Sequence, residues 1–117
     1  MSWTVLFHPD FDPEFAGMPE EVRKSVAVVL VVLRDRGPQL GRPMVDTLNG
    51  SDFPNMKEIR MTAADGEWRF AFAFDPRRQA IVLCGGDKSG VSQRVFYRAL
   101  IKKADERYKA WRESTEQ

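Results

Sequence analysis

The sequence predicts one small α+β domain over residues 1–117, with the element order β-α-α-β-β-β-α. Three observations lead to this prediction. Residues 68–74 alternate aromatic with small or charged side chains, as a strand with one buried face does. Residues 18–36 and 92–112 instead repeat apolar side chains at helical spacing. The predicted strands follow one another closely, so we expect a mostly antiparallel four-stranded sheet with the helices packed on one face.

The composition is that of an ordinary globular protein. Of the 117 residues, 43% are hydrophobic and 30% are charged, which excludes a disordered tail or a fibre. With Cys84 as the one cysteine and His8 as the one histidine, an internal disulfide and a cysteine–histidine zinc site are excluded, and we expect no metal and no cofactor. No apolar run approaches the about 20 residues of a membrane span. The start also lacks a secretory pattern, so we expect a cytoplasmic protein.

The first third of the chain predicts one strand and two helices. Residues 3–7 alternate and form the strand, and a proline-rich break then leads to a short helix with Asp12 as its N-cap. Residues 18–36 are rich in valine, but Pro19 and the acids after it begin a helix, and residues 37–38 (Gly-Pro) end it. Because valine occupies so many positions, we expect more than half of this helix's circumference to be buried.

The remainder of the chain predicts a loop, three strands and a long helix. Glycine and proline interrupt residues 39–54, which we interpret as an extended loop. Strands are predicted at residues 56–62, 68–74 and 80–85. The final helix, residues 92–112, has Ser92 as its N-cap and an apolar stripe along one side.

Charge is distributed unevenly along the chain although the net charge is only +1. Residues 1–21 contain five acids and no lysine or arginine, whereas residues 54–117 contain 13 bases and nine acids. A basic second half on a nearly neutral protein indicates a face that meets a polyanion. The alternative is a solvated helix, because Arg94, Arg98 and Lys102 recur at intervals of four residues on one exposed helix face.

Strand alternation places two arginines on one face of the predicted sheet. If the aromatic residues of 68–74 point into the core, Arg69 lies on the opposite face beside two alanines. The same alternation in residues 56–62 places Arg60 and Glu58 on that face. Like charges side by side repel, and an anion bound between them would relieve the repulsion. The alternative is that the two arginines are splayed apart, or paired with Glu58 and Asp65.

A glycine-rich turn, residues 85–90, follows the last predicted strand and contains Lys88. Glycine lets the backbone turn sharply and approach a ligand closely, although a plain strand-to-helix connector is the commoner use. The spacing is not that of a nucleotide-binding loop. We expect Lys88 to emerge at the edge of the face that carries Arg60 and Arg69, with Tyr97 one turn into the final helix.

This set of side chains suits the cleavage of RNA. RNA carries its own nucleophile, the 2′-hydroxyl, beside the scissile phosphate. An enzyme must align that hydroxyl, stabilise the charge that develops on phosphate oxygens and handle two protons. Arg60 and Arg69 suit the phosphate, Lys88 is the candidate base and Tyr97 the candidate proton donor or relay. The reaction predicted in this way needs no metal ion.

Blocks of residues along nearly the whole chain resemble the phage-derived, HigB-like branch of the RelE/ParE superfamily of toxins. The matching blocks are residues 33–38 (LRDRGP), 40–43 (LGRP), 45–48 (VDTL), 54–60 (PNMKEIR), 68–69 (WR), 71–76 (AFAFDP), 78–81 (RQAI), 86–90 (GDKSG) and 96–97 (FY). The resemblance implies a RelE-like fold, in which a curved sheet carries helices on its convex side and an open basic concave face. It further implies the toxin of a type II toxin–antitoxin pair, a ribosome-dependent mRNA endoribonuclease that inhibits translation.

The resemblance also implies partners and site residues. A helix-turn-helix, HigA-like antitoxin would bind the toxin, and operator DNA would be reached only through that antitoxin. Carried over by position, the catalytic residues are Arg60, Arg69, Lys88 and Tyr97, and the residues that hold mRNA or ribosomal RNA are Lys57, Arg94, Arg98 and Lys102. Two alternatives stay open, because the same fold hosts ParE-like inhibitors of DNA gyrase, which cleave no RNA, and an inactive relative would only bind its antitoxin.

Overall fold

The computed structural model describes residues 2–116, which form five strands and three α-helices. The elements in chain order are β1 (Thr4–Phe7), α1 (Phe11–Ala16), α2 (Glu20–Arg36), a 3-10 turn (Gly37–Gln39), β2 (Val45–Thr47), β3 (Met56–Ala63), β4 (Gly66–Phe74), β5 (Gln79–Asp87) and α3 (Gln93–Thr115). The predicted strands and helices are all present, with ends that shift by a few residues.

The strands form one mixed sheet in the order β1-β5-β4-β3-β2. The β3–β4 and β4–β5 pairs are antiparallel, as predicted, and so is the β2–β3 pair, whereas β1 pairs in parallel with β5. The prediction of four strands was wrong by one, because β2 lies within the segment predicted as a loop. This three-residue strand has little local signal and is held in place by pairing with residues 57–59 of β3.

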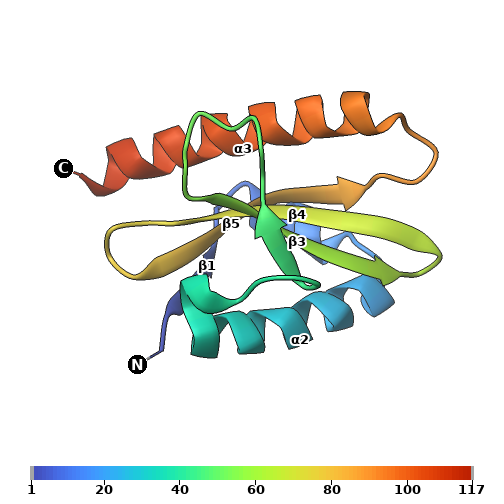
Figure 1. The fold of residues 1–117 in the computed structure, drawn as a ribbon, viewed down its shortest axis with the longest axis horizontal. Helices are drawn as coiled ribbons and strands as arrows, with labels where there is room; N and C mark the ends of the chain where they lie inside the picture. Colours follow the sequence, from blue (N-terminus) through green and yellow to red (C-terminus); the bar gives the residue numbers. More distant parts are fainter. Residues whose placement is uncertain (1, 117) are drawn as a thin grey trace.

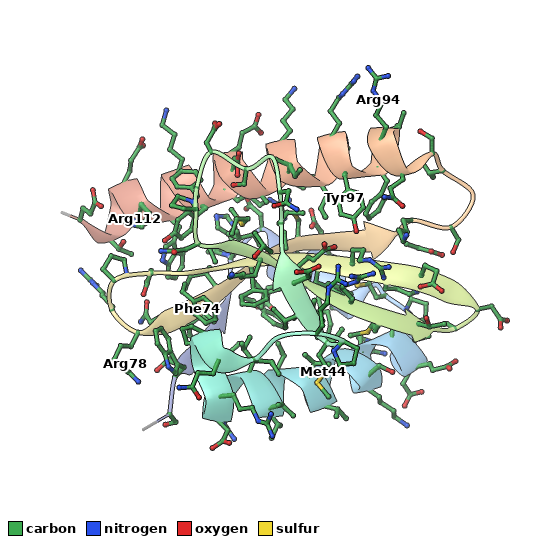
Figure 2. The ribbon with its side chains drawn as sticks, viewed as in Figure 1. Met44, Phe74, Arg78, Arg94, Tyr97 and Arg112 are labelled. Atoms are coloured by element: carbon green, nitrogen blue, oxygen red, sulfur yellow. The ribbon has the colours of Figure 1, made fainter. Side chains whose placement is uncertain are left out.

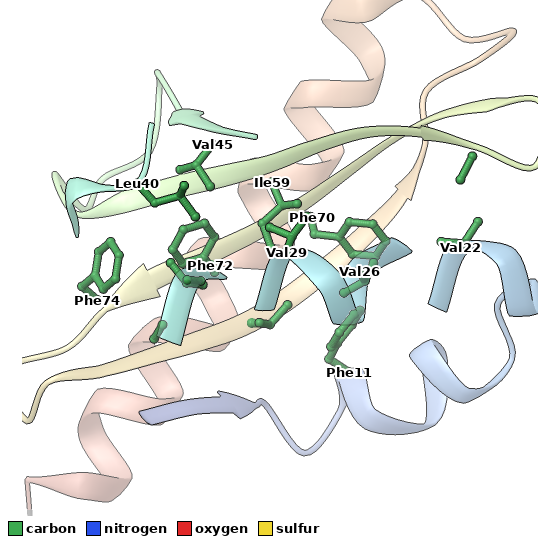
Figure 3. Close-up of a cluster of buried hydrophobic side chains, with 14 residues drawn as sticks. Phe11, Val22, Val26, Val29, Leu40, Val45, Ile59, Phe70, Phe72 and Phe74 are labelled. Atoms are coloured by element: carbon green, nitrogen blue, oxygen red, sulfur yellow. The ribbon is translucent and has the colours of Figure 1, made fainter. Parts of the chain in front are cut away.

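The aromatic side chains of β4 point toward α2. Phe70, Phe72 and Phe74 are buried in one cluster with the inner side of α2, which contributes Val22, Val26, Val29 and Leu33. Figure 3 shows this cluster, with the α2 valines facing the phenylalanines across the layer. Burial of each phenylalanine contributes roughly 2–3 kcal/mol. The predicted alternation of β4 is therefore confirmed.

The other face of the sheet is covered by α3. The alanines of β4, Ala71 and Ala73, are fully buried beneath Leu100, Ala104 and Tyr108 of that helix. Figure 1 shows α2 and α3 on opposite sides of the sheet. The expectation that the helices pack on one face was therefore wrong. Small side chains on this face leave space, and a helix occupies most of that space.

The two long helices begin and end much as the sequence predicts, whereas the prediction of Asp12 as the N-cap of α1 was wrong: Asp10 precedes this helix, and Asp12 lies within its first turn, where an acid suits the positive end of the helix dipole. In α2, Glu20 and Glu21 lie in the first turn, and its buried residues follow one stripe. Val28 and Val31 are 62% and 59% exposed, so the expected burial of more than half the circumference was wrong. Ser92 caps α3, because its side-chain oxygen accepts a hydrogen bond from the backbone N–H of Val95.

The segment between β2 and β3 is tied to α3. Asp105 accepts hydrogen bonds from the Ser51 hydroxyl at 2.5 Å and from the backbone N–H of Asp52 at 3.0 Å. The ring of Phe53 packs edge-on against Tyr108, with centroids 4.9 Å apart. Figure 1 shows this segment rising from the sheet to α3. It therefore forms a wall beside the sheet face that α3 covers.

Candidate functional site

Two adjoining hollows lie at the end of the sheet near the start of α3, and Arg42 and Arg60 line both of them. The first hollow, of about 380 Å³, is lined by Arg42, Pro43, Arg60, Met61, Thr62, Glu67 and Arg69. The second, of about 340 Å³, is lined by Arg42, Asp46, Thr47, Leu48, Asn49, Glu58, Arg60, Lys88, Gln93 and Tyr97. Both volumes lie in the range of small-ligand sites. All four residues predicted to be catalytic therefore line one hollow or the other.

The strand register explains why charged side chains meet here. Arg60 of β3 lies directly opposite Arg69 of β4, and Glu58 lies opposite both Ala71 of β4 and Asp46 of β2. Residues opposite one another, and every second residue along a strand, share a sheet face. The prediction that Arg60, Arg69 and Glu58 share one face is confirmed.

Arg69 is an internal cation and not a free one. Its side chain is 6% exposed, and its Nε donates a hydrogen bond to the Tyr97 hydroxyl at 3.2 Å. Its Nη1 donates to the backbone carbonyl of Trp68 at 2.9 Å. The carboxylates of Glu58 and Glu67 each lie 3.7 Å from its guanidinium. The expectation that Arg69 stands on an open face was wrong, because α3 places Tyr97 over it.

Tyr97 joins Arg69 to Glu58. Its hydroxyl donates a hydrogen bond to Oε1 of Glu58 at 2.7 Å while it accepts the one from Arg69. Burial, together with the carboxylate of Glu58, raises the pKa of Tyr97 above its ordinary value, so the phenol is neutral at physiological pH. Figure 2 shows Tyr97 pointing from α3 toward the sheet. These three groups form a buried network at the base of the hollows.

Asp46 neutralises much of the charge at the outer rim. Arg42 contacts it through Nε at 2.9 Å and Nη2 at 2.8 Å, and Nη1 of Arg60 lies 3.6 Å away. The hydrogen bond from Arg42 is the main cause that lowers the pKa of Asp46 below its usual range. Pairing with acids was the alternative expected from the sequence, and it is the arrangement found, with Asp46 and Glu67 in the place of Asp65.

Lys88 lies where β5 leaves the sheet. Its backbone N–H donates to the carbonyl of Glu67 at 2.8 Å, which fixes the turn against β4. Its half-buried side chain lines the second hollow together with Arg60 and Tyr97. Gly85, at the start of the turn, has a structural role, because the ring of Phe70 occupies the position that a side chain would take.

The residues predicted to hold RNA do not all gather at the hollows. Lys57 lies opposite Phe72, so it shares the other face of the sheet, where its Nζ donates to the Thr47 hydroxyl at 3.2 Å. Arg94, Arg98 and Lys102 are exposed on α3, and none of the three is among the residues that line the hollows. Figure 2 shows Arg94 pointing away from the sheet. These three form a separate basic strip on the outside of α3.

Several polar residues that line the hollows were not among the predicted site residues, and they include Arg42, Asp46, Glu58 and Gln93. Alternation along β3 does place Glu58 on the same face as Arg60, but the sequence suggested it only as an ion-pair partner for an arginine and not as a site residue. Arg42 and Asp46 were not predicted, because Asp46 lies within a strand that was itself not predicted and Arg42 lies just before that strand. Within residues 2–116, no cluster of three or more histidine, cysteine, aspartate or glutamate side chains is placed to hold a metal ion. No helix in that range is long and apolar enough to cross a membrane.

The single histidine and the single cysteine both lie away from the hollows. His8 is buried, and its Nδ1 accepts a hydrogen bond from the backbone N–H of Asp10 at 3.0 Å, which makes it a local capping residue. Cys84 is buried in the core against α3, and burial raises the pKa of its thiol to about 12. Neither residue lies among those that line the two hollows.

Comparisons with known proteins identify relatives for most of the chain. Residues 13–109 match the family described as Phage derived protein Gp49-like (DUF891). The chain is 43% identical over 107 residues to HigB3 of Mycobacterium tuberculosis (strain ATCC 25618 / H37Rv), a protein whose name provisionally describes it as a toxin. This match covers 92% of this chain and 91% of HigB3. It is 44% identical over 93 residues to HigB2 of the same organism, named in the same way, where the match covers 79% of this chain and 46% of that protein.

Solved structures of RelE toxins share the fold. A free double mutant of Escherichia coli toxin RelE superposes with a TM-score of 0.65 at 17% identity, over 92% of this chain and 98% of that chain. The archaeal RelE–RelB complex from Pyrococcus horikoshii OT3 gives a TM-score of 0.55 at 15% identity, over 78% of this chain and 100% of that chain. The predicted RelE-like α+β fold is confirmed, apart from the fifth strand and the helix on the second face.

Proposed function

The chain belongs to the phage-derived Gp49-like family, and from this membership we propose that it is the toxin of a type II toxin–antitoxin system that cleaves mRNA. Its mycobacterial relatives carry the names of toxins, and its fold is that of RelE. The observation that carries the proposal is the hollow lined by Arg60, Lys88, Glu58 and Tyr97, which offers cations to a phosphate beside a paired phenol and carboxylate.

The proposed reaction uses the 2′-hydroxyl of RNA as the nucleophile. A bond forms between the 2′-oxygen and phosphorus while the bond from phosphorus to the 5′-oxygen breaks. One proton leaves the 2′-hydroxyl and another is given to the departing 5′-oxygen. Arg60 and Lys88, which reach the same hollow, stabilise the charge on the phosphate oxygens. The step needs no metal ion.

The structure changes the roles that we propose for three residues. Because the Tyr97 hydroxyl is bonded to Glu58 at 2.7 Å, we assign the proton transfers to this pair and not to Lys88. Arg69 is buried and bonded to Tyr97, so we assign it a positioning role and the stabilisation of Glu58. Lys88 then serves as a charge for the phosphate, together with Arg60.

The strip of Arg94, Arg98 and Lys102 is the proposed contact to the sugar–phosphate backbone of mRNA or ribosomal RNA. It lies on the exposed side of the helix that carries Tyr97, and Arg94 directly follows Gln93, which lines the second hollow. Lys57, on the other sheet face, is assigned only a peripheral contact.

We propose a helix-turn-helix, HigA-like antitoxin as the cognate partner, with operator DNA bound through that antitoxin and the ribosome as the site of action in the cytoplasm. The solved complexes of RelE with RelB support an antitoxin partner, because they contain toxins of this fold bound to their antitoxins. A short reading frame for a helix-turn-helix protein beside the gene of this chain would support the pairing.

Primer extension on a translated message tests the nuclease proposal. The purified chain is added to a translation reaction, and the same message is treated without ribosomes. Cleavage is expected only with ribosomes, and Arg60→Ala is expected to slow it by about 10²–10³-fold. Arg36→Ala, at an exposed arginine at the end of α2, is the matched control and keeps the wild-type rate. Translation that stops while the message stays intact would refute the proposal, and inhibition of DNA gyrase in a supercoiling assay would then favour the ParE-like alternative.

A second test concerns the basic strip. Each base that neutralises a phosphate of single-stranded RNA contributes about 0.7 to the slope of log affinity against log salt. Arg98→Ala combined with Lys102→Ala is therefore expected to reduce that slope by about 1.4. The control is Lys109→Ala, which removes an exposed lysine farther along α3. An unchanged slope in the double variant would show that the strip is ordinary solvated surface.

A further inference from the structure

The two edges of the sheet differ in how they are protected. At one edge, β2 has three residues, and Asp46 within it is paired to Arg42. Short length and charge are the usual means of keeping an edge strand from pairing with another chain. At the other edge, β1 contains Val5, Leu6 and Phe7 and no charged residue. The β1 edge therefore lacks the protection that the β2 edge has.

The backbone of β1 has hydrogen-bonding groups that point away from the sheet. The N–H groups of Thr4 and His8 donate to the carbonyls of Arg78 and Val82, on the side of β5. In a strand with alternating backbone directions, the N–H and C=O groups of Val5 and Phe7 then point outward. Among residues 2–116, no strand pairs with this outer side of β1. These groups are available to a further strand.

An apolar groove runs beside this edge. It is lined by the whole of β1 and by Leu30 and Val31 of α2, with Asp12 and Arg34 at its ends. Val31 is 59% exposed although it is an aliphatic side chain in the groove. A strand that added to β1 would cover this side chain, so hydrogen bonds and apolar burial would favour the same docked position.

We propose that a second copy of this chain occupies the β1 edge, with the two β1 strands antiparallel across a two-fold axis. The charges at the ends of the groove favour a copy of the chain over an unrelated segment. Asp12 follows the Phe7 end of β1, and Arg34 contacts the Trp3 end, where its carbonyl accepts a hydrogen bond from the Trp3 N–H. Antiparallel pairing places the Asp12 end of each copy against the Arg34 end of the other.

The position of the edge leaves the proposed catalytic site free. The hollows are formed by residues near β2, β3 and β4, whereas β1 lies at the opposite edge of the sheet, beyond β5. A dimer built on β1 therefore has two sites on its outer sides. Self-association is independent of RNA cleavage, so each proposal can fail without the other.

Sedimentation of the purified chain at rising concentration tests the dimer. A species of twice 13.4 kDa is expected. Val31→Glu, which places a carboxylate in the groove, is expected to weaken self-association at least tenfold. Val91→Glu is the matched control, because Val91 is 47% exposed and lies before α3, away from the groove, and it leaves self-association unchanged. A monomer at every concentration up to about 1 mM would overturn the proposal.

A charge exchange identifies the surface. Asp12→Arg alone, or Arg34→Asp alone, places like charges at both ends of the interface and is expected to weaken the dimer by about three- to tenfold. The double variant restores opposite charges and is expected to regain most of the wild-type affinity, a rescue that damage to the fold would not produce. A dimer that neither single variant weakens would lie on another surface and would overturn the proposal. The proposal would also be overturned if the chain remained monomeric and the backbone N–H groups of β1 were protected from hydrogen exchange only when an antitoxin was bound.

Discussion

The two faces of the β3–β4 hairpin differ in how much space they leave for a functional site. Toward α2, the face is filled by large side chains such as Phe70, Phe72 and Ile59, which leave no room for a ligand. Toward α3, the alanines of β4 let the helix pack closely along most of the face. At the start of α3 polar side chains replace the apolar contacts, and there the second hollow forms.

The same comparison separates two kinds of stabilisation. The α2 side depends on apolar area and close packing, which are insensitive to pH and salt. The polar end of the α3 side depends on the network of Glu58, Tyr97 and Arg69, where each group satisfies another that is buried with it. Substitutions on the two faces should therefore differ in size and in their response to solution conditions.

The largest expected effect is on the α2 side. Phe72→Ala removes a fully buried ring from the centre of the cluster and is expected to lower the free energy of unfolding by about 3–5 kcal/mol. Chemical denaturation measures the change, and Phe72→Leu, which keeps most of the volume, should lose less. A loss below about 1 kcal/mol in Phe72→Ala would show that this face is loosely packed.

The polar end of the α3 face should respond to the loss of one charge. Glu58→Gln keeps the shape and an acceptor for Tyr97, but Arg69 then loses the buried one of its two neighbouring carboxylates. We expect a loss of about 2–3 kcal/mol in stability. Glu67→Gln is the control, because its carboxylate is half exposed at the same distance from Arg69. Equal losses in the two variants would contradict the assignment of Glu58 as the main buried partner.

The close packing of α3 on the alanines of β4 predicts a smaller loss of stability when one of these alanines is enlarged. Ala73→Leu adds a branched side chain where Ala73 is fully buried beneath the helix, and is expected to cost about 1–3 kcal/mol through overpacking. Thermal unfolding, with Ala110→Leu on the exposed side of α3 as the control, measures this cost. An unchanged stability in Ala73→Leu would mean that α3 does not pack closely against this face of the sheet.

The alternation of side chains made much of this fold predictable from the sequence. Period-two patterns in β3 and β4 placed Arg60 and Arg69 on one face, and the residues that begin and end a helix located both long helices. The parallel pairing of β1 with β5 joins residues about 75 positions apart, and no local pattern reports it. The alanines beside Arg69 suggested a sheet face open to solvent, but small side chains are equally typical of a face against which a helix packs closely.

The sequence predicted most cations of the candidate site, whereas it missed Arg42 and Asp46. Arg60, Arg69, Lys88 and Tyr97 do line the hollows, although their roles stay predictions. Asp46 escaped prediction because its strand is defined by pairing with β3 and not by its own sequence. Burial of Arg69 follows from the position of Tyr97 on α3, which depends on how that helix crosses the sheet.

The smallest expected effect comes from the Tyr97 hydroxyl, and its dependence on pH identifies its surroundings. Burial and Glu58 raise the pKa of Tyr97 in the folded protein, so the folded state keeps the phenolic proton above about pH 10, where the unfolded chain begins to lose it. The stability that this hydroxyl contributes is therefore complete below about pH 10 and is lost as the pH rises toward the raised folded-state pKa.

Tyr97→Phe removes both hydrogen bonds of the hydroxyl and is expected to cost about 1 kcal/mol at pH 7. Above about pH 10 the difference in stability between wild type and variant should shrink, because ionisation of Tyr97 stabilises the unfolded state of the wild type and the variant has no such group. Tyr108, whose pKa is also raised by burial, is present in both proteins and cancels in the comparison. A difference that grows with pH would mean that the Tyr97 phenolate is stabilised in the folded protein, with Arg69 and not Glu58 as its dominant partner.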